Sequence, residues 1–477
     1  MARAARLSLA ALAAALVPPL ALPASALAHG ISQRADLPIP EWLFAWAAAL
    51  VLIASFAALA VLWTSPLLER VRERPLLRVP LTLETLAGAV GVAAFAAVVY
   101  AGLAGSQTAT ANLAPTTIYV LFWVGVPCLS LLLGDVFRAF SPWRAVGRAC
   151  GATARRLAGG SLPEPIAYPR RLGRWPAAVG ILAFAWVELV YAGREDPSTL
   201  ALLALAYLVV MLTGMSLFGV EAWTRNADPF GVAFGLVALL APLRWSGGRA
   251  YLRPPLVGAP RMAEIPGSVA LVVVLIGSTT FDGFSQGGVW TGADGLAARL
   301  ADVFGSLGLG RESAVQAGYT VGLLAIVLLV AALFRLGVWG MRSVGGSSLG
   351  STELARRFAH TLVPIALAYL VAHYFSLLAI QGQAIGYLAS DPLGDGSNLL
   401  GTAAWTVDYG LVGAGAIWYV QVGALVLGHV AGLTLAHDRA LATWSDPRRA
   451  TRSQYWMLLV MVAFTCLGLW LLSAASQ

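Results

Sequence analysis

The sequence predicts an all-α membrane protein, a polytopic bundle of about ten transmembrane helices, and three observations lead to this fold class. Hydrophobic residues make up 59% of the 477 residues and charged residues 11%, with a mean hydropathy of +0.77. That composition leaves too little polar surface for a water-soluble fold. Apolar runs of about 20 residues, the length that a helix needs to cross a bilayer, recur along the chain. The basic residues gather between alternate runs, as the positive-inside rule describes.

Residues 1–28 have the composition of a cleavable secretory signal peptide. Two arginines precede an apolar run over 7–22, and the Ala-Leu-Ala of 26–28 supplies the small residues that signal peptidase requires. Cleavage at this point would make His29 the mature N-terminus and place it outside the membrane. An uncleaved membrane anchor is the alternative.

The remainder, 29–477, is expected to form a single transmembrane bundle. Its ten predicted spans are 42–64, 82–104, 116–135, 176–193, 199–221, 267–285, 316–338, 359–382, 409–436 and 454–475. With the mature N-terminus outside, the first span runs inward, and every second loop faces the cytoplasm.

The arginines support this topology independently. All 31 basic residues are arginine, and 24 of them fall in the five loops that should be cytoplasmic, whereas the exterior segments hold four. The five loops are 65–81, 136–175, 222–266, 339–358 and 437–453. The net charge of +8 therefore reports membrane topology and not nucleic-acid binding. We expect a multi-pass protein of the cell (inner or cytoplasmic) membrane, with the lipid bilayer as its main partner.

Two further segments have helical character without spanning. The stretch 228–243 begins with Asp-Pro-Phe and continues as an apolar run too short to cross a bilayer, which predicts an interfacial or re-entrant helix. The exterior loop 283–318 is predicted to contain a short surface helix. The three cysteines are scattered without CxxC spacing, so neither a disulfide framework nor a zinc knuckle is indicated.

Four of the five histidines lie on the eighth and ninth spans. At about 1.5 Å per residue, His360 and His437 lie near the cytoplasmic face of these antiparallel helices. His373 lies roughly 20 Å and His429 roughly 12 Å above that face, so both fall near the middle of a core about 30 Å thick.

Two interpretations of these histidines stay open. Neutral imidazole suits copper, zinc and iron, and His373 and His429 are candidates for axial haem ligands. Histidines also hydrogen-bond across membrane helices simply to fix their packing. Asp438 adds a carboxylate beside His437, and His29, as a mature N-terminus, would offer copper its amine and its ring together.

Two acidic residues within the spans are candidate catalytic or pathway groups, because ionisable side chains are costly in hydrocarbon. Glu188 lies deep in the fourth span, and Asp282 lies near the outer end of the sixth, where it could equally be a water-exposed helix-end acid. The sequence contains no phosphate-binding P-loop, HExxH, GxSxG or dinucleotide fingerprint. An ATP-driven pump is therefore excluded for the single chain.

Short motifs spread over nearly the whole chain carry a family resemblance. They are Ala28-His29-Gly30, Leu37-Pro38-Ile39-Pro40, Gly134-Asp135-Val136-Phe137-Arg138, Ser141-Pro142-Trp143-Arg144, Phe184-Ala185-Trp186-Val187-Glu188, Thr280-Phe281-Asp282-Gly283, His360-Thr361-Leu362-Val363-Pro364, Ala372-His373-Tyr374, Gly428-His429 and Ala436-His437-Asp438-Arg439. In these motifs the chain resembles a bacterial, largely actinobacterial, family of polytopic membrane proteins labelled fenitrothion hydrolase. The resemblance implies hydrolysis of an organophosphate ester by a metal-bound hydroxide or a general base. It also implies the histidines and Asp438 as metal ligands, with Glu188 or Asp282 as the base.

Three functions are thus compatible with the sequence. They are a membrane-embedded metal-dependent hydrolase, a transporter or metal-handling permease with the histidines and Glu188 in its pathway, and a haem-bearing redox protein. Transporters tend to show internal repeats and paired broken helices, which this sequence lacks, so a metal-site enzyme or redox protein ranks above a carrier. A small-molecule substrate and a partner membrane subunit are both compatible with the sequence.

Overall fold

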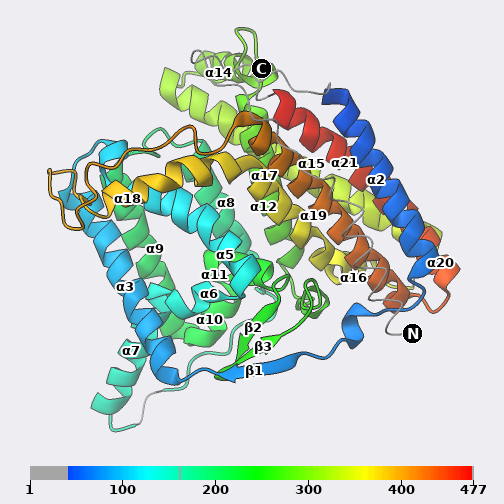
Figure 1. Cartoon of the computed structure of the whole chain (residues 1–477), viewed down its shortest axis with the longest axis horizontal. Coiled ribbons are helices and arrows are strands. Elements are labelled where there is room, and N and C mark those ends of the chain that lie inside the picture. Colours follow the sequence, from blue (N-terminus) through cyan, green and yellow to red (C-terminus); the bar gives the residue numbers. More distant parts are fainter. Residues whose placement is uncertain (1–40, 161–162, 347, 475–477) are drawn as a thin grey trace. The chain divides into compact units, whose positions relative to one another are not determined.

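Long apolar helices account for nine of the ten predicted spans. The computed structural model describes residues 41–160, 163–346 and 348–474 (Figure 1), so the predicted signal peptide and His29 lie outside the described residues. Within these ranges, nine helical segments are long and apolar enough to cross a membrane: Leu43–Leu62, Leu81–Ala104, Leu113–Leu133, Pro197–Phe218, Ser268–Gln286, Arg311–Gly345, Ser351–Leu388, Ala414–Thr443 and Pro447–Leu471. The chain is therefore a multi-pass membrane protein.

The helices of these spans follow the apolar runs of the sequence. They are α2 (Glu41–Leu62), α3 (Leu81–Ala104), α4 (Leu113–Pro115) with the π-helical η3 (Thr116–Gly125) and α5 (Val126–Leu133), α9 (Pro197–Phe218), α12 (Ser268–Gln286), α15 (Arg311–Gly345), α17 (Val363–Gln381), α19 (Ala414–Thr443) and α21 (Tyr455–Ala474).

Shorter helices connect or flank them. They are α6 (Val136–Phe140), α7 (Pro142–Leu157), α8 (Trp175–Leu189), α10 (Val220–Asn226), α11 (Pro229–Ala238), α13 (Gly288–Thr291), α14 (Leu296–Ser306), α16 (Ser351–Phe358), α18 (Ile385–Leu388) and α20 (Pro447–Ser453). Single 3-10 turns are η1 (Leu68–Arg70), η2 (Ala109–Ala111), η4 (Ala259–Arg261), η5 (Ala359–Leu362) and η6 (Gly382–Ala384).

The predicted fourth span, 176–193, forms the shorter helix α8. Its 15 residues extend about 22 Å, less than the roughly 30 Å of a bilayer core. The helix ends at Leu189, and the residues after it form turns that lead into Pro197. It packs against α11 and α12 and so lies within the bundle, with neighbours along its length.

Two predicted spans are longer in the structure. The seventh, predicted over 316–338, is the 35-residue α15, which extends about 52 Å and therefore exceeds the thickness of a bilayer core. The ninth, predicted over 409–436, begins at Ala414 and continues to Thr443, so that His437 and Asp438 are helical. Hydropathy did not predict this extension because residues 437–443 include polar side chains. Contacts to other segments stabilise these side chains in the helix.

The short helix expected within 228–243 is α11, and the surface helix expected within 283–318 is α14. Eight of the ten residues of α11 are buried, and the helix packs against α5 and α8. Asp228 begins it, because its carboxylate accepts a hydrogen bond from the Gly231 amide at 3.0 Å.

A three-stranded sheet forms where the sequence predicted only loops. Strands β1 (Arg74–Arg78), β2 (Leu243–Ser246) and β3 (Arg249–Leu252) pair antiparallel in the order β1-β3-β2, with Arg74 opposite Leu252. Gly247 and Gly248 make the β2–β3 turn with φ of +59° and +68°, values that suit glycine. The sheet thus joins two of the arginine-rich loops.

Buried Glu73 holds this sheet to the segment after it. Its carboxylate forms ion pairs with Arg244 at 2.7 Å, with Arg253 at 3.3 Å and with Arg261. Burial alone would raise the pKa of Glu73, but the hydrogen bond from Arg244 and the charges of the three arginines outweigh it and lower that pKa below 4.5.

Helices α17 and α19 approach each other closely along their length. A Cβ atom on Gly428 would lie 2.8 Å from the Pro364 carbonyl oxygen, and one on Gly432 would lie 2.8 Å from the Thr361 oxygen. Only glycine fits at both positions without displacing the backbone of α17 or of the η5 turn before it. This small-xxx-small spacing is typical of tightly packed membrane helices.

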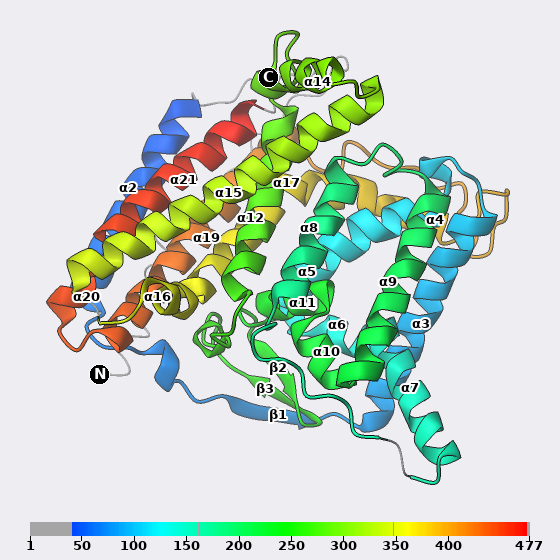
Figure 2. The same cartoon turned by 180° about the vertical axis from the view of Figure 1, so that it is seen from behind.

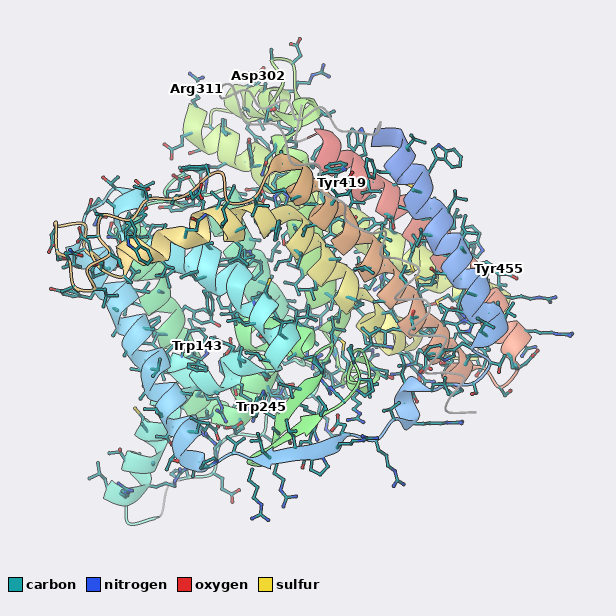
Figure 3. All side chains as sticks on the ribbon, in the orientation of Figure 1. Trp143, Trp245, Asp302, Arg311, Tyr419 and Tyr455 are labelled. Atoms are coloured by element: carbon teal, nitrogen blue, oxygen red, sulfur yellow. The ribbon has the colours of Figure 1, made fainter. Side chains whose placement is uncertain are left out.

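The connecting segments separate into two ends of the bundle. The sheet, α7, α10, α16 and α20 lie toward one end, which we call the arginine-rich end, and α14 with the 389–413 loop lies toward the other (Figures 1 and 2). Figure 3 shows the same separation, with Asp302 and Arg311 near α14 and Trp245 at the sheet. Large apolar side chains, such as Trp46 at 65% and Leu328 at 67% exposed, face outward from the spans, as lipid contact requires.

Candidate functional site

A buried acid–histidine pair lies between α12 and α17. The Asp282 carboxylate oxygen Oδ2 lies 2.8 Å from His373 Nε2 and accepts a second hydrogen bond, also of 2.8 Å, from the Tyr374 hydroxyl. Gln286 donates to the other oxygen, Oδ1, at 3.2 Å. The Asp282 and His373 side chains are each 14% exposed, so both lie largely inside the helix bundle.

Glu188 brings a second carboxylate toward this pair. It lies on α8, close to the Tyr374 hydroxyl and within electrostatic range of Asp282. Tyr374 donates its proton to Asp282 and not to Glu188. We call Glu188, Asp282, His373 and Tyr374 the intramembrane cluster.

The cavity beside the cluster is small. It has a volume of about 30 Å³ and is lined by polar and small residues that include Thr279, Thr280, Tyr369 and His373. A water molecule needs at least roughly 10–15 Å³ of such space and takes about 30 Å³ in the liquid, so this cavity has room for one or two waters. It is far below the 300 Å³ or more of a typical site for an organic ligand.

His429 occupies a separate place on α19. Its Nδ1 lies 2.8 Å from the Leu425 carbonyl oxygen, and because a carbonyl can only accept, Nδ1 carries the proton. Its Nε2 is buried without a hydrogen-bond partner and borders an apolar cavity of about 40 Å³. The Tyr369 ring packs 6.1 Å from the His429 ring, while the Tyr369 hydroxyl donates to Phe464 O on α21 and not to His373.

His437 and Asp438 join α19 to the segment after α2. His437 Nε2 lies 2.9 Å from the Trp63 carbonyl oxygen, and its Nδ1 lies 3.1 Å from the Gln454 amide nitrogen. Asp438 Oδ1 accepts from Trp63 Nε1 and from the amides of Leu67 and Leu68 at 2.6–3.2 Å. These contacts hold α19 to the segment after α2, and both ring nitrogens of His437 already have partners.

His360 lies in the 3-10 turn η5 that precedes α17. Its Nδ1 lies 3.0 Å from the Arg357 carbonyl oxygen, and its Nε2 is buried without a partner. The four histidines thus make four separate sets of contacts. Among the described residues, no three or more His, Cys, Asp or Glu side chains are grouped so that they could hold a metal ion.

The cavities beside His373 and His429 do not fit a haem. Their volumes, about 30 and 40 Å³, are an order of magnitude below those of typical cofactor pockets. His373 also directs its Nε2 toward Asp282. The geometry therefore does not favour axial haem ligation by these two residues.

Sequence reasoning named Glu188, Asp282 and His373 but missed Tyr374. The signal was available, because Tyr374 is the chain neighbour of His373. Adjacent residues on a helix point about 100° apart, so helical spacing alone puts Tyr374 on a different face of α17 from His373. Asp282 reaches both residues because its carboxylate lies between them.

Comparisons of the chain with protein-family models, with curated proteins and with solved structures give no match. The function is therefore argued from the geometry of the intramembrane cluster.

Proposed function

We propose that the chain is a proton-translocating carrier of the cell membrane and that the intramembrane cluster is its proton-binding site. The observation that carries the proposal is the 2.8 Å contact between Asp282 and His373 inside the candidate spans. Ionisable groups in such positions are rare and typically belong to ion pathways or proton relays.

The cluster contains the groups that a relay needs. Asp282 and His373 can share one proton or release it, and each change alters the charge buried between α12 and α17. Tyr374 donates to Asp282 and lies close to Glu188, which supports a proton route from one carboxylate toward the other. An unpaired charge is costly in this environment, so each protonation state favours a different arrangement of the helices.

The cavity volume supports a proton over a larger substrate. About 30 Å³ beside His373 admits a water or a hydrated proton, whereas an organophosphate ester requires a pocket roughly ten times larger. The size of the cavity therefore favours proton movement over ester hydrolysis.

In the membrane, we place the arginine-rich end in the cytoplasm and the mature N-terminus outside. The five loops with 24 arginines support this orientation through the positive-inside rule. The relay would then connect the exterior side, nearer Asp282, with the cytoplasm.

Proton entry into liposomes tests the proposal. The purified protein is reconstituted, a potassium diffusion potential is applied with valinomycin, and a trapped pH-sensitive dye reports the internal pH. We expect proton entry for the wild type and for Asp302→Asn, which removes an exposed carboxylate on α14, and loss of entry for Asp282→Asn and His373→Gln. Entry at the wild-type rate in a folded Asp282→Asn protein would refute the proposal.

Hydrolysis of an organophosphate ester, implied by the family resemblance, is the second candidate. The observation in its favour is that Asp282 engages Nε2 of His373 and leaves Nδ1 as the basic nitrogen, an arrangement that suits a general base. Turnover of a phosphotriester by the wild type that is lost in His373→Gln, in a preparation without proton entry, would select this function.

A further inference from the structure

A cavity larger than the one beside the intramembrane cluster lies at the arginine-rich end. It has a volume of about 220 Å³ and is lined by residues of α6, α7, α10 and α11 and of the segments that precede α8 and α12. Its charged lining residues are Asp135, Arg138, Arg144, Arg174, Arg225, Asp228 and Arg261. Two of the motifs singled out in the sequence, Gly134–Arg138 and Ser141–Arg144, contribute to its wall.

Arg174 is the unusual residue of this cavity. It is only 9% exposed, its Nη1 donates to Ser268 Oγ at 3.1 Å, and its Nε is buried with no hydrogen-bond partner. None of the described carboxylates forms an ion pair with it, and burial alone lowers the pKa of Arg174 to about 10. A buried guanidinium without a counter-charge is costly, and a bound anion would remove that cost.

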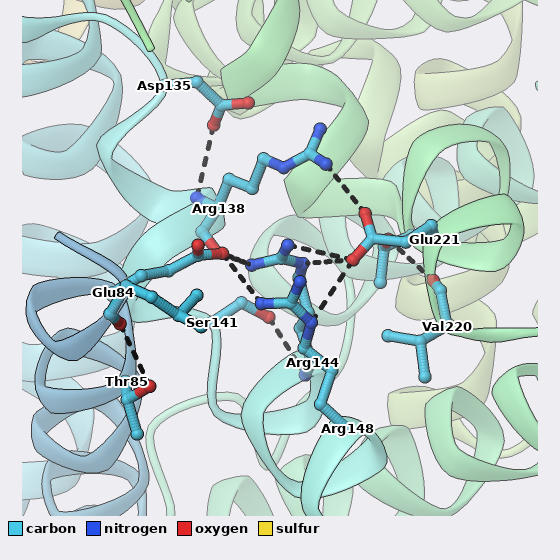
Figure 4. Close-up of polar contacts among 11 residues, drawn as sticks. Glu84, Thr85, Asp135, Arg138, Ser141, Arg144, Arg148, Val220 and Glu221 are labelled. Atoms are coloured by element: carbon cyan, nitrogen blue, oxygen red, sulfur yellow. Dashed lines mark hydrogen bonds and ion pairs between the residues drawn. The ribbon is translucent and has the colours of Figure 1, made fainter. Parts of the chain in front are cut away.

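The neighbouring arginines differ from Arg174, because Arg138, Arg144 and Arg261 form ion pairs and Arg225 is exposed to solvent. Arg144 donates to Glu84 at 2.8 Å and to Glu221 at 2.9 Å, and Arg138 contacts Glu221 at 2.7 Å (Figure 4). Arg138 is nearly half exposed, whereas the Arg144 side chain is buried with its charge paired. Arg174 differs from both, because its guanidinium is buried and forms no ion pair with the described carboxylates.

The two acidic residues of the lining do not neutralise Arg174. Asp228 is fully engaged, because it accepts from Trp143 Nε1 and from the Tyr207 hydroxyl, each at 2.7 Å, and from the Gly231 amide. Asp135 accepts a hydrogen bond from the Arg138 amide at 3.2 Å, and burial raises its pKa.

We infer that this cavity binds a phosphoryl group, with Arg174 as the central ligand. A guanidinium presents donors in a planar fork that matches phosphate oxygens. A volume of 220 Å³ equals about seven water volumes, enough for a phosphoryl group with a small substituent. Basic pockets at the cytoplasmic ends of membrane helices are also where anionic lipid headgroups bind.

The phosphoryl group could belong to an anionic phospholipid or to a soluble phosphate compound, and two measurements separate these sources. In delipidated protein in detergent, the thermal unfolding temperature is followed during titration with inorganic phosphate and with glycerol 3-phosphate. In parallel, native mass spectrometry counts phosphatidylglycerol molecules retained after it is added back, with diacylglycerol as the uncharged control. Stabilisation by the soluble compounds indicates a soluble ligand, and retention of phosphatidylglycerol alone indicates a lipid.

Variants of Arg174 test whether the thermal stabilisation and the lipid retention come from binding in this cavity. Arg174→Gln should abolish both signals, whereas Arg156→Gln, which removes an exposed arginine near the end of α7, should leave them unchanged. Arg174→Lys keeps the charge but lacks Nε and the planar fork, and it should raise the half-saturating phosphate or lipid concentration about tenfold.

If Arg174→Gln does not fold, Arg174→Lys and Ser268→Ala decide, because the latter removes the hydroxyl that orients Nη1 and besides it only a 3.4 Å hydrogen bond to Ala263 O. The inference is overturned if neither signal occurs in the wild type, or if Arg174→Lys binds as the wild type does. This inference does not depend on proton translocation, because its measurements need no flux.

Discussion

Replacing Glu73 with Gln should release the small sheet from the rest of the protein. Glu73 is 7% exposed at its side chain, and its partner Arg253 is 2% exposed, so the substitution leaves a buried cation without its counter-ion. Removing one partner of a buried pair costs about 3–5 kcal/mol. We expect a cost near 3 kcal/mol, the lower end of this range, because Arg253 keeps its hydrogen bonds to the carbonyl oxygens of Ala238, Leu239 and Ala241.

Hydrogen exchange measures this cost locally. A loss of about 3 kcal/mol corresponds to roughly two orders of magnitude in an opening equilibrium. The backbone amides of β1, β2 and β3 should therefore exchange about 100-fold faster in Glu73→Gln, while those of α17 and α19 keep their protection. The matched control is Glu353→Gln, whose carboxylate is 53% exposed and lies 3.9 Å from Arg357; a surface pair of this kind contributes at most about 1 kcal/mol.

Unchanged protection of the sheet in Glu73→Gln would refute the reasoning. Equal loss of protection in the sheet and in the long helices would refute it too, because that result would mean global and not local opening. The first outcome would show that strand pairing alone holds the sheet.

Three further predictions concern other parts of the molecule. The pKa of Glu73 is lowered below 4.5 in the folded protein, so its contribution to stability is complete above that pH and is lost as the pH falls through the folded-state pKa. The protection factors of the sheet amides, which correct for the pH dependence of intrinsic exchange, should therefore fall below pH 4.5 in the wild type and not in Glu73→Gln. Asp438→Asn weakens three hydrogen bonds to the segment after α2 and should cost about 1–3 kcal/mol, detected as faster proteolysis near residues 63–70. Gly428→Ala should lower the thermal unfolding temperature because its Cβ would meet the backbone of α17, whereas Gly423→Ala on the same helix meets nothing within 4 Å and should not.

The spans were predictable from sequence because membrane insertion depends on local composition. A run such as 82–104 is apolar throughout, and hydropathy identifies it without knowledge of any neighbour. The sheet was not predictable on these grounds. Its strands have four or five residues, and β1 pairs with a strand more than 170 residues later, held by Glu73 and the arginines around it.

Three members of the intramembrane cluster were predictable, but Tyr374 and the pairing of Asp282 with His373 were not. Glu188, Asp282 and His373 stand out because charged and ionisable side chains are rare in the spans. Helical spacing indicates which residues share one face, but not how each helix is rotated toward its neighbours. For that reason the sequence paired His373 with His429, whereas packing of α12 on α17 pairs it with Asp282.

Helices α8 and α12 both run from the Arg174 cavity to the intramembrane cluster. They pack side by side, and the hydrogen bond from Arg174 to Ser268 joins the residue before α8 to the first residue of α12, beside the cavity that Arg174 lines. Glu188 follows Arg174 by 14 residues, and Asp282 follows Ser268 by the same number, so each carboxylate lies about 21 Å further along its helix. A sliding of one helix against the other would break the contact at one end and change the separation of the carboxylates at the other. Occupation of the cavity should therefore alter proton entry, and Arg174→Gln should make entry insensitive to added phosphate or phosphatidylglycerol. Equal sensitivity in the variant and the wild type would mean that the two sites act independently.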